Sequence, residues 1–194
     1  MLIDMNDLPD ALRAQIGILR GLVLGALADF HGKHRELRVD YSARSEASII
    51  HDYMVKQAKV AGFDWKLKRN LFLFRVGTDF SVKPKKLDRQ LRPRNVLTQL
   101  VLDFERQRVM HLFDDLDLTH LFLGYQRDGA ELLTSSIWLV CPDGRGVKWA
   151  AELRAEDAAA AVEFALPVTP TMPTETEGRR IKPKKIAKPA VIGE

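Results

Sequence analysis

The stretch that decides the fold is LTHLFLGYQRDGAELLTSSIWLVCPDGRGVKWAAEL, residues 118–153. Two turn signals divide its apolar runs, Asp128-Gly129 and Pro142-Asp143-Gly144. An Asp-Gly pair between apolar runs is the strongest short-range signal of a β-hairpin. The pattern therefore predicts an antiparallel meander. Its three strands are predicted over 118–126, 132–141 and 147–153.

The segment before this meander has the same strand-like alternation. Gly77-Thr78-Asp79 is predicted to be the loop of a hairpin. Pro84 cannot donate a ladder hydrogen bond, so the strand that contains it is predicted to end there or to lie at an edge. The chain is thus expected to form an antiparallel sheet of about six strands. The three additional strands are predicted over 63–68, 71–76 and 80–86.

Helical periodicity appears before the first strand, between the two groups of strands and after the last one. Ser42 and Asn95 are good N-cap residues for the second and third helices. The fourth helix is short. The helices are predicted over about 8–31, 43–61, 96–108 and 155–164.

The composition changes after Pro167 to Thr, Pro, Glu, Lys and Arg with few large apolar side chains. Such a segment cannot bury enough apolar surface to fold. We therefore predict a single α+β domain over 1–167, with two N-terminal helices, one inserted helix and the sheet. A disordered basic tail is predicted over 168–194.

The composition of the 194 residues excludes several classes of protein. A single cysteine, Cys141, forms neither an internal disulfide nor a cysteine-rich zinc site. The longest apolar run, 21–28, is far shorter than the roughly 20 residues that span a membrane. Asp4 makes the N-terminus acidic where a secretory signal would be basic. We expect a cytoplasmic protein that does not enter the membrane.

The charge is unevenly distributed along the chain. Residues 66–94 hold ten basic and two acidic residues, a net charge of +8, and residues 169–194 carry +3. Because the whole chain carries +4, the remainder carries −7. Clustered lysine and arginine attract polyanions.

The basic segment is the first candidate site. Arg92 and Arg94 come just before the predicted cap Asn95, and a helix N-terminus flanked by arginines suits a phosphate group. The alternative is a surface that pairs with the acidic remainder of this protein or with an acidic protein partner. The candidate phosphate- or nucleic-acid-binding residues are Lys83, Lys85, Lys86, Arg89, Arg92 and Arg94.

The predicted order of helix, three strands, helix and strand resembles the core of the PD-(D/E)XK nucleases. That resemblance would match Glu46 to the helical carboxylate, Asp79 to the aspartate, and Lys83 or Lys85 to the lysine. Ser81 and Lys83 stand two positions before these lysines, so the second metal-binding carboxylate is missing. An enzymatic alternative requires four residues to converge in one cleft. These are Glu46, His51, Asp79 and Lys85.

Other chemistry-bearing patterns are weak. His31 and His34 have no accompanying metal-ligand motif, and Cys141 is expected to be a small buried residue. Gly144-Arg145-Gly146 reads as a hairpin turn and does not open a helix, so it is no phosphate-binding loop. We expect no metal and no cofactor, and we favour a non-enzymatic function over an enzymatic one.

A glycine stripe marks the first predicted helix. Gly17, Gly21 and Gly25 follow one another at intervals of four residues, although glycine costs about 1 kcal/mol against alanine inside a helix. Close packing against a neighbouring helix would offset that cost. The neighbour is the protein's own second helix or, alternatively, a second copy of the chain in a homodimer.

Several short motifs between residues 42 and 153 resemble a poorly characterised group of small bacterial proteins. That group is encoded, in phages, plasmids and other mobile elements, beside regulators that combine a helix-turn-helix with an ImmA-type metallopeptidase. The motifs are Arg44 to Met54, Lys85 to Asp88, Arg94-Asn95, Thr98-Gln99, Gly124-Tyr125, and Cys141-Pro142 before Trp149.

The resemblance implies a regulatory, toxin–antitoxin or phage-defence context, with such a regulator as a protein partner, and it brings no enzymatic activity. We therefore expect a non-enzymatic module of a mobile element that binds a protein partner and, through its basic residues, nucleic acid. The alternative is a divergent PD-(D/E)XK-like nuclease or toxin that acts on nucleic acid.

Overall fold

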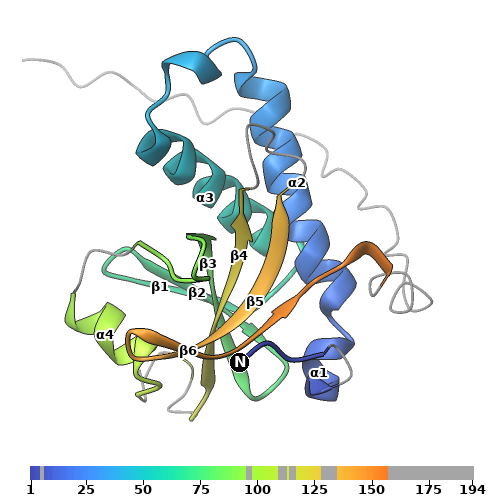
Figure 1. The fold of residues 1–194 in the computed structure, drawn as a ribbon, viewed down its shortest axis with the longest axis vertical. Coiled ribbons are helices and arrows are strands. Elements are labelled where there is room, and N and C mark those ends of the chain that lie inside the picture. Colours follow the sequence, from blue (N-terminus) through green and yellow to red (C-terminus); the bar gives the residue numbers. More distant parts are fainter. Residues whose placement is uncertain (5–6, 95–97, 109–112, 114–116, 128–134, 157–194) are drawn as a thin grey trace, which may run out of the picture. The chain divides into compact units, whose positions relative to one another are not determined.

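Six strands form one sheet in the order β1-β2-β3-β4-β5-β6, so neighbours in sequence are also neighbours in space (Figure 1). The structure is a computed structural model, and it describes residues 1–4, 7–94, 98–108, 113, 117–127 and 135–156. The strands are β1 (Trp65–Lys68), β2 (Leu71–Val76), β3 (Phe80–Leu87), β4 (Thr119–Gln126), β5 (Ser136–Asp143) and β6 (Gly146–Glu152).

The α+β class and the six strands predicted from the sequence are confirmed, but two expectations were wrong. The strand β3 neither ends at Pro84 nor lies at an edge, and it accommodates the proline because β2 pairs with it only from Phe80 to Val82. One strand pairing also differs. The sheet is mixed: β3 and β4 run parallel, with Phe80 opposite Thr119 and Leu87 opposite Gln126, whereas the other four pairs are antiparallel. The expectation of a fully antiparallel sheet was therefore wrong for this pair. The cause is the crossover through α4, which carries the chain back to the start of β3 before β4 begins.

The described helices are α1 (Asp10–Arg13), α2 (Ile16–His34), the 3₁₀ turn η2 (Arg38–Asp40), α3 (Ala43–Val60) and α4 (Gln99–Glu105). The single helix predicted over 8–31 is thus divided into α1 and α2. Ser42 caps α3 as predicted, accepting a hydrogen bond from the Ser45 amide at 3.1 Å.

Helix α4 begins later than the sequence suggested. Its N-cap is Thr98, whose hydroxyl accepts from the Val101 amide, while the predicted cap Asn95 lies outside the described residues. Nearly all of the helix predicted over 155–164, and the whole predicted tail, also lie outside the described residues.

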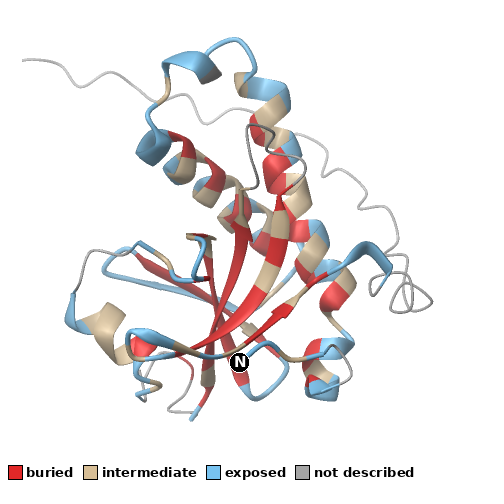
Figure 2. Cartoon of the chain, viewed as in Figure 1, coloured by how far each residue is buried: buried red, intermediate tan, exposed pale blue. Residues whose placement is uncertain are grey.

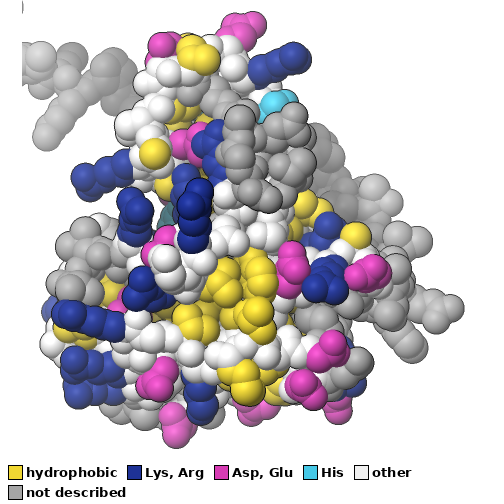
Figure 3. All heavy atoms as spheres, in the orientation of Figure 1, with side chains coloured by type: hydrophobic (Ala, Val, Ile, Leu, Met, Phe, Trp, Pro, Cys, Tyr) yellow, Lys and Arg dark blue, Asp and Glu magenta, His cyan; other side chains and the backbone are white. Residues whose placement is uncertain are grey.

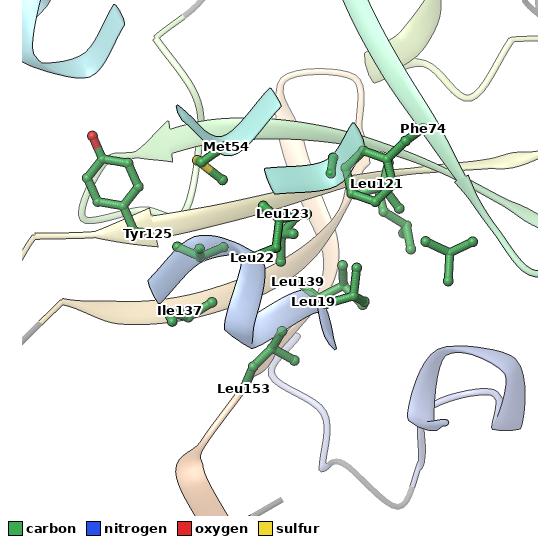
Figure 4. Close-up of a cluster of buried hydrophobic side chains, with 14 of the residues drawn as sticks. Leu19, Leu22, Met54, Phe74, Leu121, Leu123, Tyr125, Ile137, Leu139 and Leu153 are labelled. Carbon is green, nitrogen blue, oxygen red and sulfur yellow. The ribbon is translucent and has the colours of Figure 1, made fainter. Parts of the chain in front are cut away.

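Helices α2 and α3 cover one face of the sheet and bury the larger core against it (Figure 2). Leu19 and Leu22 of α2 and Met54 of α3 pack with side chains of β2, β4 and β5 such as Phe74 and Leu123 (Figure 4). The opposite face carries a second, smaller cluster beneath α4. It contains Leu71, Leu73, Leu87, Leu91, Phe104, Phe113, Leu118, Phe122, Val140 and Ala150.

One glycine of the stripe, Gly25, packs towards α3. A Cβ atom on Gly25 would lie 3.3 Å from the Gln57 side chain of α3, so close packing against the protein's own helix explains this glycine. Gly21 is exposed and has nothing within 4 Å of such an atom. The homodimer alternative remains a prediction.

The two edges of the sheet differ. Along β6, the Ile3 amide donates to the Ala150 carbonyl and the Ala150 amide donates to the Met1 carbonyl, each at 3.0 Å. Among the described residues, none pairs with the outer edge of β1. No helix in the described part of the chain has the length and apolar character needed to cross a membrane.

Candidate functional site

The basic residues predicted to form one surface lie in three different environments. Lys83 and Lys85 share one face of β3, Lys86 lies on the other face, and the arginines follow the strand. Lys83 is buried, at 5% exposure, and its Nζ lies 5.6 Å from the centre of the Phe104 ring. Burial, with a further contribution from Lys85, lowers the pKa of Lys83 to about 7, while Glu105 opposes the shift. The expectation that Lys83 contacts phosphate at the surface therefore needs correction: its amine faces the core beneath α4.

We expect Lys83→Met to stabilise the protein by about 1–2 kcal/mol at pH 6, because a buried ammonium is replaced by an apolar chain of similar length beside Phe104. In the wild type, the pKa of Lys83 is lower in the folded protein than in the unfolded chain. The destabilisation that comes from burying its charge is therefore complete below pH 7 and decreases as the pH rises towards 10. The gain from the substitution should therefore shrink with pH in urea unfolding. An equal gain at pH 6 and pH 10 would exclude this account.

Lys85 and Lys86 lie on opposite faces of β3. Lys85 is half-buried, and burial lowers its pKa while Glu105 opposes the shift. Lys86 points towards α3, where its Nζ lies 3.6 Å from Glu46. The Arg127 guanidinium also donates to both oxygens of Glu46, at 3.1 and 3.2 Å. We call Glu46, Lys86 and Arg127 the Glu46 cluster, and in it Lys86 is already paired.

The four residues of the enzymatic alternative do not assemble in one cleft. Glu46 and His51 both lie on α3; the pKa of His51 is lowered by burial and then by the charge of Lys85, while Asp52 opposes the shift. Asp79 lies in the turn before β3, exposed and bonded to the Thr78 hydroxyl. Six residue steps along β3, roughly 20 Å, separate it from Lys85. Among the described residues, no three carboxylate, histidine or cysteine groups are placed to hold a metal ion.

A serine–histidine pair that the sequence does not reveal lies inside the protein. The Ser81 hydroxyl bonds to His120 Nδ1, and His120 Nε2 donates to the Arg108 carbonyl at 2.8 Å. Both side chains are buried, and burial lowers the pKa of His120. His120 also stacks on Phe104 at 4.8 Å. The pair therefore joins β3, β4 and α4 and has no access to a substrate.

Residues 88–94 form a tight turn after β3 that we call the hook. Asp88 Oδ1 accepts hydrogen bonds from the Gln90 and Arg92 amides, each at 2.9 Å, and the Asp88 amide donates to the Arg92 carbonyl at 2.9 Å. Leu91 is held at a φ of 59°, a conformation that a leucine rarely adopts. Its side chain is buried in the smaller cluster. Strain of this kind persists where surrounding contacts fix the backbone, and it is common at functional sites.

The hook forms one wall of a groove of about 390 Å³, and the β5–β6 hairpin forms another. Arg92 and Arg94 line it from the hook, and Arg145 lines it from the hairpin turn. We call this hollow the arginine groove. The remaining lining residues are Asp88, Leu91, Pro93, Glu105, Phe122, Val140, Pro142, Gly144, Gly146 and Val147.

Helix α4 holds the hairpin in place beside this groove. The Gly144 amide donates to the Glu105 carbonyl at 2.8 Å, and the Gln107 side chain donates to the carbonyls of Pro142 and His120 at 3.0 and 2.9 Å. A second hollow of about 290 Å³ adjoins the groove and adds Arg106 to its rim. In Figure 3 hydrophobic side chains gather over β5 and β6, and lysine and arginine side chains lie towards α4.

The exposed charge of the arginine groove is positive. Arg92, Arg94 and Arg145 are exposed, whereas Glu105 is buried at 7% exposure and Asp88 Oδ1 is occupied by two backbone amides. Sequence reasoning found the two hook arginines but assigned Arg145 only to a turn. The signal that could have found it is a lone arginine between two glycines at a hairpin tip.

Comparisons of the chain with protein-family models, with curated proteins and with solved structures find no match.

Proposed function

We propose that this chain is a non-enzymatic module that binds the phosphate backbone of nucleic acid in the arginine groove. The observation that carries the proposal is the convergence of Arg92, Arg94 and Arg145, from two chain segments far apart in sequence, around one apolar hollow. Arginine donates two parallel hydrogen bonds to a phosphate. Leu91, Val140 and Val147 also line the groove, and such apolar groups suit the apolar faces of sugars and bases.

The rigidity of the walls supports the same function. Backbone and side-chain hydrogen bonds hold the hook, and the Glu105 carbonyl holds the hairpin. Arginines on preorganised segments lose less conformational freedom when they bind, so more of the contact energy appears as affinity. Arg89 is also exposed on the hook and would extend the contact along the strand.

The biological context of the proposal rests on the resemblance of residues 42–153 to the small proteins of mobile elements. We propose a cytoplasmic regulatory or defence role in which a protein partner is bound as well. The nuclease alternative has less support, because Asp79 lies at the far end of β3 and the position two before Lys85 is the buried Lys83.

The test is binding of a labelled single-stranded oligonucleotide and a duplex at 50 and 200 mM salt, measured by fluorescence anisotropy. Three phosphate contacts release enough counterions to weaken wild-type binding by roughly 20- to 40-fold between these salt concentrations. We expect R92A/R94A/R145A to lose most of its affinity at 50 mM salt and most of its sensitivity to added salt. Circular dichroism checks that the variant folds.

A control variant removes two exposed cations of the helical layer, Arg35 and Lys56. R35A/K56A should bind as the wild type does. Equal loss in both variants would show only a general effect of net charge, and unchanged binding by R92A/R94A/R145A would refute the groove as the site. Cleavage of the oligonucleotide with magnesium present would refute the non-enzymatic function.

A further inference from the structure

Strand β1 presents an unpaired backbone edge. The Arg75 amide donates to the Asp64 carbonyl at 2.7 Å, which makes Asp64 and Arg75 a hydrogen-bonded pair of the β1–β2 ladder. Such pairs alternate along an antiparallel ladder, so Lys66 and Lys68 bond to β2. The amide and carbonyl groups of Trp65 and Leu67 therefore point outwards, and no described residue pairs with them.

The side chains of β1 alternate in chemistry between the two faces of the sheet. Trp65 and Leu67 share a face with their partners Phe74 and Phe72, on the side of α2 and α3, yet they are 41% and 61% exposed. Lys59 of α3 lies 4.2 Å over the Trp65 ring. Lys66 and Lys68 are exposed on the opposite face. The edge thus offers an apolar row on one face and a cationic row on the other.

We propose that β1 is a docking edge for an extended peptide of a partner protein in which acidic and apolar residues alternate. The peptide adds a seventh strand, with backbone hydrogen bonds to Trp65 and Leu67. Its apolar side chains pack on Trp65 and Leu67, and its carboxylates face Lys66 and Lys68. This goes beyond the arginine groove, which uses none of these residues.

Charge decides between this occupant and a second copy of the chain. Antiparallel pairing of two β1 strands would place Lys66 and Lys68 of both copies on one face, and like charges opposite each other destabilise a sheet. An acidic strand turns the same positions into cross-strand ion pairs. The opposite edge strand, β6, is covered by a bridge to Leu2. Among the described residues, the edge of β1 has no such cover and can accept another strand.

The probe is a fluorescently labelled eight-residue peptide of alternating glutamate and valine, and its control is a peptide of the same composition with the glutamates grouped together. We expect the alternating peptide to bind at least about tenfold more tightly than the grouped one. K66E/K68E should no longer bind this peptide and should instead bind a peptide of alternating lysine and valine. R35E/K56E is the matched control and should leave the preference unchanged.

Amide hydrogen exchange gives the second readout, because attraction between charges alone does not protect a backbone amide. The Trp65 and Leu67 amides should exchange more slowly with the alternating peptide bound, and Leu67→Pro, which removes one outward amide, should weaken binding. Equal affinity for both peptides, or unchanged exchange at these amides, would overturn the proposal. Slower hydrogen exchange of the same amides in the presence of duplex DNA would overturn it too, since the β1 edge would then be part of a nucleic-acid-binding surface.

Discussion

Gly124→Ala should destabilise the protein by about 3 kcal/mol or more, the largest effect that we expect from a single methyl group. In the parallel pairing Gly124 lies opposite Lys85, and a Cβ atom there would meet the Lys85 carbonyl oxygen at 2.5 Å and Leu87 Cγ at 2.6 Å. Backbone cannot move aside as a flexible side chain does, so β3 and β4 would have to separate. Urea unfolding of the purified variant measures the loss.

The matched control is Gly21→Ala, which adds the same methyl group to a glycine on the exposed side of α2, with nothing within 4 Å of it. Alanine is the better helix former by about 1 kcal/mol, so this variant should be more stable than the wild type. If Gly124→Ala were as stable as the wild type, the close approach of β3 and β4 would be wrong. Because the hook follows β3 directly, Gly124→Ala should also weaken oligonucleotide binding.

Glu46→Ala is expected to destabilise the protein by about 3 kcal/mol. Glu46 is 5% exposed and is the partner of both Arg127 and Lys86, whose side chains are each only 28% exposed. Removing the carboxylate leaves two largely buried cations near each other, and the penalty for an uncompensated buried charge exceeds the worth of the ion pair itself. Thermal or urea unfolding at pH 7 measures the difference.

Two further variants test which property of Glu46, and which of its neighbour Tyr125, matters for stability. Glu46→Gln keeps a hydrogen-bond acceptor for Arg127 but also removes the negative charge, so it should lose nearly as much stability as Glu46→Ala. Tyr125→Phe should be neutral or slightly stabilising, because the Tyr125 hydroxyl is buried without a hydrogen-bond partner among the described residues. If Glu46→Gln were as stable as the wild type, the lost contacts and not the negative charge would account for the effect.

Periodicity predicted most of the fold because it depends on local pattern. The alternation over β2 and β3, the turn before β6 and the Ser42 cap of α3 are each encoded within a few neighbouring residues. The parallel pairing of β3 with β4 is not encoded locally, because it depends on how the chain crosses through α4. The division of the first helix also escaped prediction, since its apolar spacing continues through the break at Ala14 and Gln15.

The candidate site could be predicted only in part, for a related reason. The charge of the segment from Lys66 to Arg94 is visible in the sequence, but burial is not, and it separates Lys83 from the exposed Arg92. The contribution of Arg145 depends on the hairpin returning to the hook. The density of charge therefore predicted which segment is basic, whereas the tertiary structure determines which of its side chains line the arginine groove.

The parallel pair in the middle of the sheet also has a consequence for the order of folding. Every residue of β3 pairs with a residue 39 positions further along the chain, from Phe80 with Thr119 to Leu87 with Gln126. The hairpins on either side close over short loops, so they can form early, whereas joining them requires a long loop to close first. The rate-limiting event is therefore expected to be the meeting of two preformed halves, and the arginine groove, which draws on both, is completed only in that last step.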